Sequence, residues 1–596
     1  MNSTLFSALA TVPFCAAVYG ADSPIFRGEY WKAEGAVYGD GRVSSEECRK
    51  TPEKAPHGHI LDYSIEVPES GWYAPFFKNG SLEQDYIVDG EIAGMFALSG
   101  RLDSDGFSQG LSLWLEKGTH KLRFMRFGRR SFPTKKFDFF ELRPLKADRA
   151  AQCVFAEVDG HDVVRLGEDL VLAVKAGNPF AAVRYEVQFA VQRDAKREDA
   201  WKSAATLDFP KSGAPAVKRA AVRLPAEGMY SLRLVSDGKE LPSGVFPRRE
   251  VVCVDVGGVS AAERDVSPGA SQTVCEIDCA ATAPDAEANG PTRVTRCDGL
   301  VYRESHDCSK EVSGPYDGNM PENLSCFSYK VKVPEAQVPY LLEVEFPDNE
   351  RRSVCVRHDW FEPGTDRYLK MNYGYQTKSW ETGGFFSVSG GMKQQGQIIW
   401  PLSTEGRVTI INQSAGTRAA CAKIRISKVA APVAKPPVAN RRIFSYWSEE
   451  GDSFAIMIGA QQLVNSAYLA AVERWLQMIR FYGGNAVSGV GVAYQGAFWR
   501  SRALASVGIP QYSQLRLFAL LAEKYGMAFI PEWFLYQDAQ HNVLFPQLAP
   551  GGREEALSKN ASGTLAGGGV NPLCPVVQDT YVAAMKEIFD EIGDAI

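Results

Sequence analysis

The last part of the chain, residues 452–596, carries the pattern that most restricts what the protein can fold into. An apolar run, SFAIMIGA (453–460), leads into a stretch from Ser466 in which large apolar residues recur every three or four positions. That stretch ends at Gly483 and Gly484. A buried strand followed by a covering helix with a glycine C-cap is the expected structure.

The same pattern occurs twice more. The run NAVSGVGVAY (485–494) predicts a second buried strand, and residues 512–525 predict a helix that ends before Gly526. A third strand, MAFIPEWF (527–534), follows, and after a long loop Pro575 begins a third helical pattern. Successive strand–helix units with unbroken apolar strands predict a parallel sheet, in either a barrel or a doubly wound arrangement.

The order of sequence motifs in this segment resembles the first three units of barrel glycoside hydrolases. In such families an Asn-Pro-x-x-Pro-x-Val run opens the third helix, and here it reads NPLCPVV (571–577). The resemblance implies that residues 443–596 form the start of an incomplete (β/α)8 TIM barrel. It also implies that the catalytic carboxylates, which come from the fourth and seventh strands in the large clan of retaining barrel glycosidases, lie beyond Ile596.

In a barrel, the chemistry sits at the C-terminal ends of the strands. The candidates for substrate binding there are Gln461, Glu532 and Trp533, together with His541 in the long loop. A carboxylate can bind sugar hydroxyls and an indole ring can stack on a sugar ring, so Glu532 beside Trp533 has suitable side chains. The alternative for Glu532 is a structural role, capping a neighbouring backbone group.

The N-terminus suggests export. Residues 1–20 are uncharged, largely apolar and end in small residues, which is typical of a signal peptide cleaved before Ala21, although the usual basic residue is missing. An uncleaved anchor and an ordinary buried segment are the alternatives. No later run reaches 18 uninterrupted apolar residues, so we expect a secreted, periplasmic or cell-surface protein without a further membrane span.

Composition limits the function classes. The 596 residues suggest about four domains, and the net charge of −6 gives no footprint for nucleic acid. Of 12 cysteines, 11 would remain after cleavage, and no spacing resembles a metal knuckle. Disulfides and buried free thiols both remain open.

Residues 24–146 are dense in short alternating segments with turn signals, including Asp89-Gly90 between two apolar runs. This pattern predicts an antiparallel β-sandwich of the jelly-roll type.

Four phrases in this region resemble carbohydrate-binding modules of the family 6 and family 35 type. They read KAEG (32–35), VPESGWY (67–73), LEKGTHKL (115–122) and FDFFEL (137–142). The resemblance implies that Glu34 and Asp138 share a structural calcium, the one cofactor expected, and that the domain binds a polysaccharide or other glycan. A purely structural sandwich is the alternative. The tryptophans Trp31, Trp72 and Trp114 are then either stacking platforms or core.

Two further β regions follow. Residues 150–256 predict an immunoglobulin-like sandwich. The Ala-, Pro- and Asp-rich stretch 281–292 predicts an exposed connection, and residues 293–429 predict a second jelly-roll-like domain. The Pro/Ala stretch 430–442 predicts a semi-rigid linker.

The second jelly-roll-like region contains two His-Asp pairs, which could serve as metal ligands but are more often surface polar residues. They are His306-Asp307 and His358-Asp359.

Together these features favour a secreted multidomain protein directed at carbohydrate. It has two jelly-roll-like modules, an immunoglobulin-like module between them and the start of a glycoside hydrolase barrel. A noncatalytic carbohydrate-binding or cell-surface protein is the alternative. The substrate sugar, its linkage, the stereochemical outcome and the oligomeric state cannot be inferred from these patterns.

Overall fold

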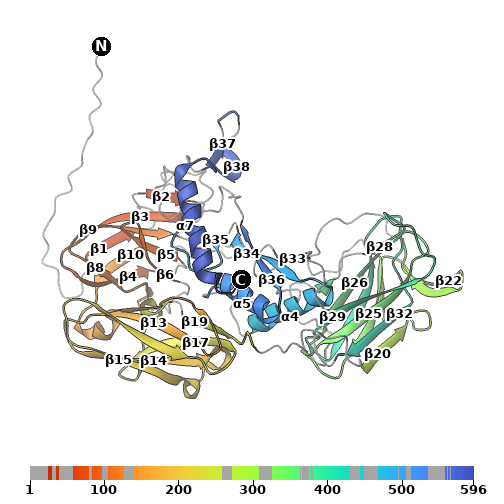
Figure 1. Cartoon of the computed structure of the whole chain (residues 1–596), viewed down its shortest axis with the longest axis horizontal. Helices are drawn as coiled ribbons and strands as arrows, with labels where there is room; N and C mark the ends of the chain where they lie inside the picture. The colour runs from red at the N-terminus through yellow and green to blue at the C-terminus, as the bar shows by residue number, and fades with distance from the viewer. Residues whose placement is uncertain are drawn as a thin grey trace, which may run out of the picture.

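The computed structural model describes the greater part of the chain. The described residues are 24–29, 35–38, 58–78, 84–96, 105–125, 138–247, 249–257, 272–307, 325–362, 364–365, 375–376, 380–429, 443–448, 467–493, 496–504, 512–533, 557–559, 561–563 and 565–595. Most of the secondary structure is β-sheet, and an α/β unit lies between the second and third β domains (Figure 1).

The first domain is a sandwich of two antiparallel sheets, as predicted. One sheet has the order β1 (Phe26–Glu29), β10 (Phe139–Pro144), β4 (Gly71–Lys78) and β7 (Phe107–Gln109), with β8 (Leu113–Leu115) also paired to β4. The other has the order β2 (Gly35–Tyr38), β3 (Gly58–Val67), β9 (Gly118–Met125), β5 (Gln84–Val88) and β6 (Glu91–Phe96). The predicted turn between β5 and β6 is confirmed, because Asp89 and Gly90 both have positive φ.

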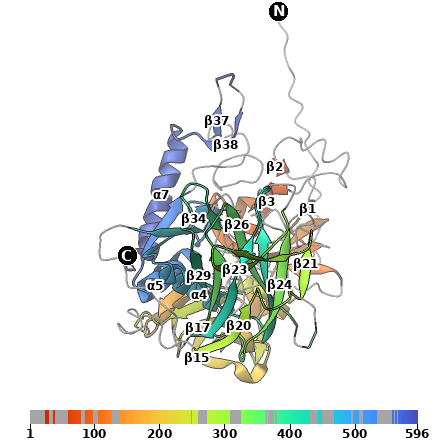
Figure 2. The same cartoon turned by 90° about the vertical axis from the view of Figure 1, so that its right-hand side faces the viewer.

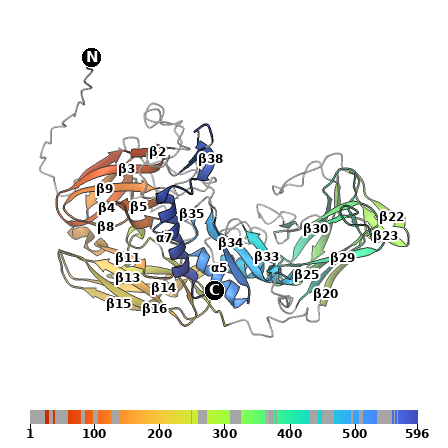
Figure 3. The same ribbon diagram turned by 45° about the horizontal axis from the view of Figure 1, so that its top comes forward.

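The second domain is also a two-sheet sandwich, and it lies next to the first (Figure 3). Its smaller sheet contains β11 (Val154–Val158), β13 (Asp169–Ala176) and β16 (Ala216–Arg223). Its larger sheet has the order β12 (Val163–Arg165), β19 (Glu250–Val254), β17 (Gly228–Ser236), β14 (Val183–Val191) and β15 (Lys202–Phe209), with β18 (Lys239–Glu240) on β17. Short 3-10 helices are η2 (Ala147–Gln152), η3 (Gln192–Asp194), η4 (Glu198–Ala200) and η5 (Ser243–Val245).

The third β domain contains three sheets (Figure 2). A four-stranded sheet has the order β20 (Gln272–Asp278), β32 (Lys423–Lys428), β25 (Tyr340–Pro347) and β29 (Met392–Ile399). A six-stranded sheet contains β21 (Ala286–Ala288), β24 (Cys326–Lys332), β30 (Glu405–Asn412), β26 (Arg352–Trp360), β27 (Tyr375–Gln376) and β28 (Trp380–Thr382). The smallest contains β22 (Arg293–Cys297), β23 (Leu300–Glu304) and β31 (Ala420–Cys421).

This domain begins earlier than the predicted boundary at residue 293. The strand β20 pairs with β32, and β21 pairs with β24, so the stretch 281–292 lies inside the domain and does not connect two domains. Its composition suggested a linker because Ala, Pro and Asp are rare in strands. Backbone hydrogen bonds from a long-range partner outweigh that local preference.

One turn motif recurs in all three β domains. In each, a Val-Pro or Leu-Pro pair ends one strand, and a tyrosine shortly afterwards returns its hydroxyl to a backbone carbonyl upstream. Tyr73 donates to Glu69 O at 2.7 Å, Tyr230 to Ala226 O at 2.9 Å, and Tyr340 to Glu335 O at 3.0 Å. This is the geometry of a tyrosine corner. The phrase VPESGWY is therefore a folding signal, and it identifies no ligand.

The last segment forms an α/β unit. The strands β33 (Ser445–Ser448), β34 (Ala486–Ala493) and β36 (Ala528–Trp533) are parallel and adjacent in that order, and β35 (Gly496–Ala497) folds back on β34. The helices are α4 (Ala467–Phe481), α5 (Gln514–Lys524) and α7 (Pro575–Ile592), and a hairpin of β37 (Leu557–Lys559) and β38 (Leu565–Val570) precedes α7. The first of these strands, β33, thus lies ahead of the predicted run 453–460. That run falls outside the described residues.

The helices of this unit pack side by side, because α5 touches both α4 and α7 as well as β34 and β36. A closed barrel is not seen: the described parallel sheet has three strands. Apolar surface is left over. Ile530 of β36 is 40% exposed, and α7 carries an exposed stripe of Val582, Met585 and Phe589 beside its buried face. None of the described helices meets the length and hydropathy expected of a membrane span.

The α/β unit shares one hydrophobic core with both neighbouring β domains. That core includes Val252 and Val254 of β19, Phe518 of α5, Trp475 of α4 and Ile398 of β29. A three-stranded sheet with a single layer of helices has too little interior of its own, so burial against the second domain supplies much of its apolar contact.

A buried arginine holds this junction together. The side chain of Arg516 on α5 is almost fully buried; its Nε donates to Val163 O at 2.8 Å and its Nη1 pairs with Asp594 at 2.7 Å. Arg165 of the second domain pairs with the same carboxylate at 2.5 Å. Hydrogen bonds from both arginines, that from Arg516 first, hold the pKa of Asp594 well below its ordinary value. Lys524 adds pairs to Glu227 at 2.8 Å and to a carboxylate of α4.

Replacing this buried arginine should loosen the α/β unit. We expect Arg516→Met to lower the free energy of unfolding of this unit by about 2–3 kcal/mol, because the buried Val163 O loses its donor and Asp594 keeps only one of its two arginine partners. Urea unfolding followed by limited proteolysis measures the effect. The control is Arg184→Met, because Arg184 and its partner Asp208 are both more than half exposed. In this variant the free energy of unfolding should change by less than about 1 kcal/mol. Equal effects from the two variants would contradict this role for Arg516.

Candidate functional site

Of the four candidate residues of the α/β unit, the structure describes Glu532 and Trp533. Trp533 packs its ring edge-on against Tyr581 of α7, with centroids 5.0 Å apart. Side chains alternate along a strand, so Glu532 points to the opposite face of the sheet. The assignment of Glu532 and Trp533 to substrate binding stays a prediction. Gln461 and His541 lie outside the described residues, and their assignment stays a prediction.

The tryptophans of the first domain have different surroundings. Trp72 is 3% exposed and belongs to a small core with Phe76, Leu145 and Cys153, where the first and second domains meet. Of the two alternatives, core and platform, the structure favours core for Trp72. Trp114 is half-buried; it meets Trp72 edge-on and donates from Nε1 to Glu116 at 2.8 Å. Trp31 lies outside the described residues.

The predicted calcium pair also remains untested. Asp138 is exposed at the bend before β10, and Glu34 lies outside the described residues. Within the part of the chain that the structure describes, no three His, Cys, Asp or Glu side chains are grouped as metal ligands would be.

The two His-Asp pairs differ from each other. His306 and Asp307 are exposed after β23. His358 and Asp359 were expected on the surface but are buried on β26, which corrects that prediction. Burial and the nearby Arg357 lower the pKa of His358 to about 3, and burial raises the pKa of Asp359 despite its pair with Arg357 at 2.9 Å. A neutral, buried histidine that accepts a hydrogen bond from Trp360 Nε1 at 3.0 Å has a packing role.

A surface that the sequence did not predict lies on the outer face of the sheet β1-β10-β4-β7. The inner face holds Tyr73, Phe77, Phe140 and Leu142, so the alternate residues of the same strands point outward. The strand register places Arg27 opposite Glu141, and Glu141 opposite Phe76; Lys78 is opposite Phe107. We call the set Arg27, Lys78, Phe107, Phe139, Glu141 and Arg143 the Arg–Phe face; Phe76 lies beside it but is buried in the inter-domain core.

Cations lie over the aromatic rings of this face. The guanidinium carbon of Arg27 is 3.4 Å from the centroid of Phe139, and that of Arg143 is 4.5 Å from Phe107. Both arginines remain accessible, since their side chains are 53% and 25% exposed. Glu141 pairs with Arg143 at 2.5 Å. Stacking fixes the plane of each guanidinium. Arg143 donates from Nε and Nη2 to Glu141 Oε2, and the N–H groups that Glu141 does not occupy suit recognition of a carboxylate or sulfate.

The hairpin phrase LEKGTHKL also proves to have a structural role. His120 on β9 lies between two turns: its Nδ1 is 2.7 Å from Asp89 Oδ2, and its Nε2 is 2.8 Å from Glu116 O. Burial lowers the pKa of His120, but these hydrogen bonds outweigh burial and the pKa is raised. Burial raises the pKa of Asp89, but bonds from the Lys121 backbone and from His120 outweigh it, so this pKa is lowered. The residues that signalled two hairpins thus bind those hairpins to each other.

This pair should make the first domain sensitive to pH. The contribution of His120 is complete below its ordinary pKa of 6.5 and is lost as the pH rises through the raised value; that of Asp89 is complete above 3.8 and is lost as the pH falls. We expect Asp89→Asn to speed hydrogen–deuterium exchange of the β5–β6 and β8–β9 hairpins more at about pH 5.5 than at about pH 9. The same ratio of variant to wild-type rates at both pH values would refute the linkage.

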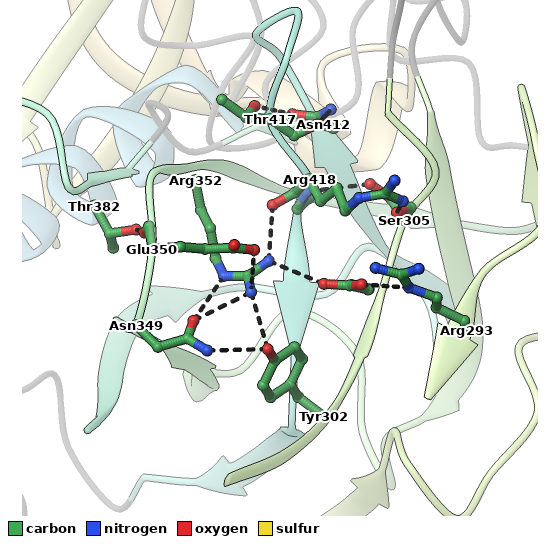
Figure 4. Close-up of polar contacts among 12 residues, drawn as sticks. Arg293, Tyr302, Ser305, Asn349, Glu350, Arg352, Thr382, Asn412, Thr417 and Arg418 are labelled. Atoms are coloured by element: carbon green, nitrogen blue, oxygen red, sulfur yellow. Dashed lines mark hydrogen bonds and ion pairs between the residues drawn. The ribbon is translucent and has the colours of Figure 1, made fainter. Parts of the chain in front are cut away.

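A buried polar network organises one end of the third β domain (Figure 4). The Arg352 side chain is fully buried, and it reaches Tyr302 Oη at 3.0 Å, Asn349 Oδ1 at 3.1 Å and Glu350 at 2.6 Å. It also pairs with the buried Glu304 at 3.3 Å. The network fixes the turn 348–351 between β25 and β26.

The turn 348–351 also positions a glycine-flanked loop between Thr382 and Ser389. Asp348 accepts from Ser389 N at 2.9 Å and pairs with Lys393 at 2.7 Å, and Thr382 Oγ1 donates to Glu350 O at 2.7 Å. The loop between these anchors carries Phe385 and Phe386, which are 96% and 78% exposed. No local sequence pattern signals this arrangement, because its contacts join residues 32, 41 and 50 positions apart in the chain, which meet only after the sheets pair.

Comparisons with known proteins give no family assignment. No family model and no curated protein matches the sequence. Solved structures that match locally include carbohydrate-binding modules and glycoside hydrolases. One is the C-terminal CBM6 of LamC, a marine laminarinase from Zobellia galactanivorans; it is 12% identical and has a TM-score of 0.17, and the match covers 26% of this chain and 98% of that module.

Two others are hydrolases. A GH2 beta-galacturonidase from Eisenbergiella tayi is 12% identical and has a TM-score of 0.16. The match covers 37% of this chain and 42% of the galacturonidase chain. Bacteroides uniformis beta-glucuronidase 2 is 12% identical and has a TM-score of 0.14. The match covers 47% of this chain and 31% of the glucuronidase chain. At such identities and TM-scores, these matches assign neither an activity nor a ligand to this chain.

Proposed function

We propose that this is a secreted, carbohydrate-directed protein whose first domain binds an acidic polysaccharide. The observation that carries the proposal is the Arg–Phe face. Arg27 and Arg143 are stacked on Phe139 and Phe107 and remain accessible. Sugars offer apolar ring faces and hydroxyls, and a uronate adds a carboxylate that a guanidinium binds in bidentate fashion.

Charge supports an acidic ligand. The chain as a whole carries a net charge of −6, yet the Arg–Phe face presents Arg27, Lys78 and Arg143 against Glu141. A local excess of cations on an acidic protein attracts anions to that face and repels them elsewhere. Neutral glucans would lack this contribution.

The α/β unit supports a catalytic role through its layout. Adjacent parallel strands with helices packed side by side agree with the start of a barrel, and the resemblance of residues 452–596 to barrel glycoside hydrolases adds a reaction class. In this proposal further strand–helix units cover Ile530 and the stripe of Val582, Met585 and Phe589. The general acid and the nucleophile then come from strands other than β33, β34 and β36.

A noncatalytic binding protein is the second candidate. The Arg–Phe face favours it, because this face is built by the first domain alone and needs no residue of the α/β unit.

Removing the two stacked guanidiniums tests the binding site. We expect Arg27→Ala/Arg143→Ala to weaken retention of the full chain in gels containing polygalacturonate by at least about tenfold, because two charge-assisted contacts are lost. Hydroxyethylcellulose should retain neither protein. The matched control is Arg184→Ala/Arg219→Ala, which removes the same charge from exposed pairs of the second domain. If the control loses retention equally, the attraction is unspecific and the site is wrong.

A second experiment tests the role of Glu532 and the placement of the catalytic pair. We expect the 596-residue chain to release no reducing sugar from polygalacturonate above the buffer background, and Glu532→Gln to leave that result unchanged. Glu532 lies on the third parallel strand, whereas the resemblance assigns the catalytic carboxylates to the fourth and seventh. Hydrolysis at an enzyme-like rate that is lost on Glu532→Gln would overturn both this role and the placement of the catalytic pair.

A further inference from the structure

Two cysteines that are far apart in the sequence meet in the core of the third β domain. Cys279 directly follows β20 and Cys421 is the last residue of β31, 142 positions later. Their sulfur atoms are 3.5 Å apart. Neither residue is exposed to solvent. The sequence alone left disulfides and buried thiols as equal alternatives for the cysteines of this chain.

We propose that Cys279 and Cys421 form a structural disulfide, made while the third β domain folds. The strands already bring the two backbones together: β20 and β32 pair up to Asp278 opposite Lys423, and Cys279 N then donates to Ala422 O at 2.9 Å. Bond formation needs the sulfurs to approach by about 1.5 Å, to the usual disulfide length of about 2.05 Å.

The chemistry needs an outside oxidant, and oxidised glutathione supplies it. One cysteine thiolate attacks the glutathione disulfide and releases one glutathione. The second thiolate then attacks the mixed disulfide and releases another. The two cysteines lose two protons and two electrons in total, and the oxidant becomes two molecules of reduced glutathione.

Burial decides when this reaction takes place. Thiolates are the reacting species, and burial with the neighbouring Cys279 raises the pKa of Cys421 well above its ordinary value. In the folded domain the pair is therefore closed to glutathione and slow to ionise. The bond therefore forms during folding, before the paired cysteines are closed off from the oxidant, and once formed it resists reductants that cannot unfold the domain.

The cross-link would act where the domain is weakest. In the described part of the chain, β20 is the edge of its sheet and pairs with β32. Most of its side chains are exposed or half-buried, so few apolar contacts hold it. A covalent bond to β31, which belongs to the small sheet with β22 and β23, fastens this edge to a second sheet and closes a long loop in the unfolded chain.

Peptide mapping of the wild-type chain tests the bond directly. The full chain is unfolded with reductant and refolded in a mixture of oxidised and reduced glutathione. It is then alkylated in denaturant and digested without reduction. We expect mass spectrometry to find the peptide of Cys279 joined to that of Cys421. Recovery of both cysteines in alkylated form, or joined preferentially to other cysteines, would overturn the proposal.

Reduction kinetics and variants test the structural role. Dithiothreitol should open this bond at least about tenfold faster in denaturant than in native buffer, since opening requires local unfolding. Oxidised chain should unfold at higher urea than reduced chain, and Cys421→Ala should abolish that difference. The control Cys153→Ala, a buried thiol of the inter-domain core, should keep it. A difference that persists in Cys421→Ala, or rapid reduction in native buffer, would refute the role assigned to this pair.

Discussion

The position of the α/β unit between its neighbours depends on the ion pair between Arg516 and Asp594 and on the apolar core around it. The α/β unit has three parallel strands with a layer of helices and a leftover apolar surface, so it cannot bury its own interior. It shares its core with β19 on one side and β29 on the other. Arg516 satisfies the Val163 carbonyl at that junction, because burying a charge and a carbonyl together is tolerable only when they are hydrogen-bonded.

The three β domains follow one plan in spite of different sheets. Each uses a tyrosine corner to reverse the chain after a strand that a Pro follows within two residues. The buried polar groups are individual to each domain: Arg123 with Asp62 in the first, and Arg352 with Glu304 in the third. Apolar side chains at alternate strand positions form the core of each sandwich. The buried polar pairs favour one arrangement of its connecting loops over others.

The residues that carry the proposed function lie on regular strands rather than on loops. The Arg–Phe face uses the outward positions of β1, β10, β4 and β7. Strands hold their side chains at fixed spacing, so the two guanidiniums keep their positions without a ligand and lose little entropy on binding. The exposed Phe385 and Phe386 are likewise held by anchored backbone.

Much of the fold could be predicted from the sequence. Strand alternation, the Asp89-Gly90 turn and the glycines that end α4 and α5 are local signals, and each is confirmed because neighbouring residues alone determine it. The α/β unit follows from the same local periodicity.

Only the tertiary structure decided which residues share a site. It moved the start of the third β domain back to β20, buried His358 and Asp359, placed Glu532 and Trp533 on opposite faces of one strand, and brought Cys279 to Cys421. The Arg–Phe face also needs the pairing of four strands that are distant in the chain. Such contacts depend on long-range register, and one residue's slip would turn every side chain to the other face, so no local pattern contains them.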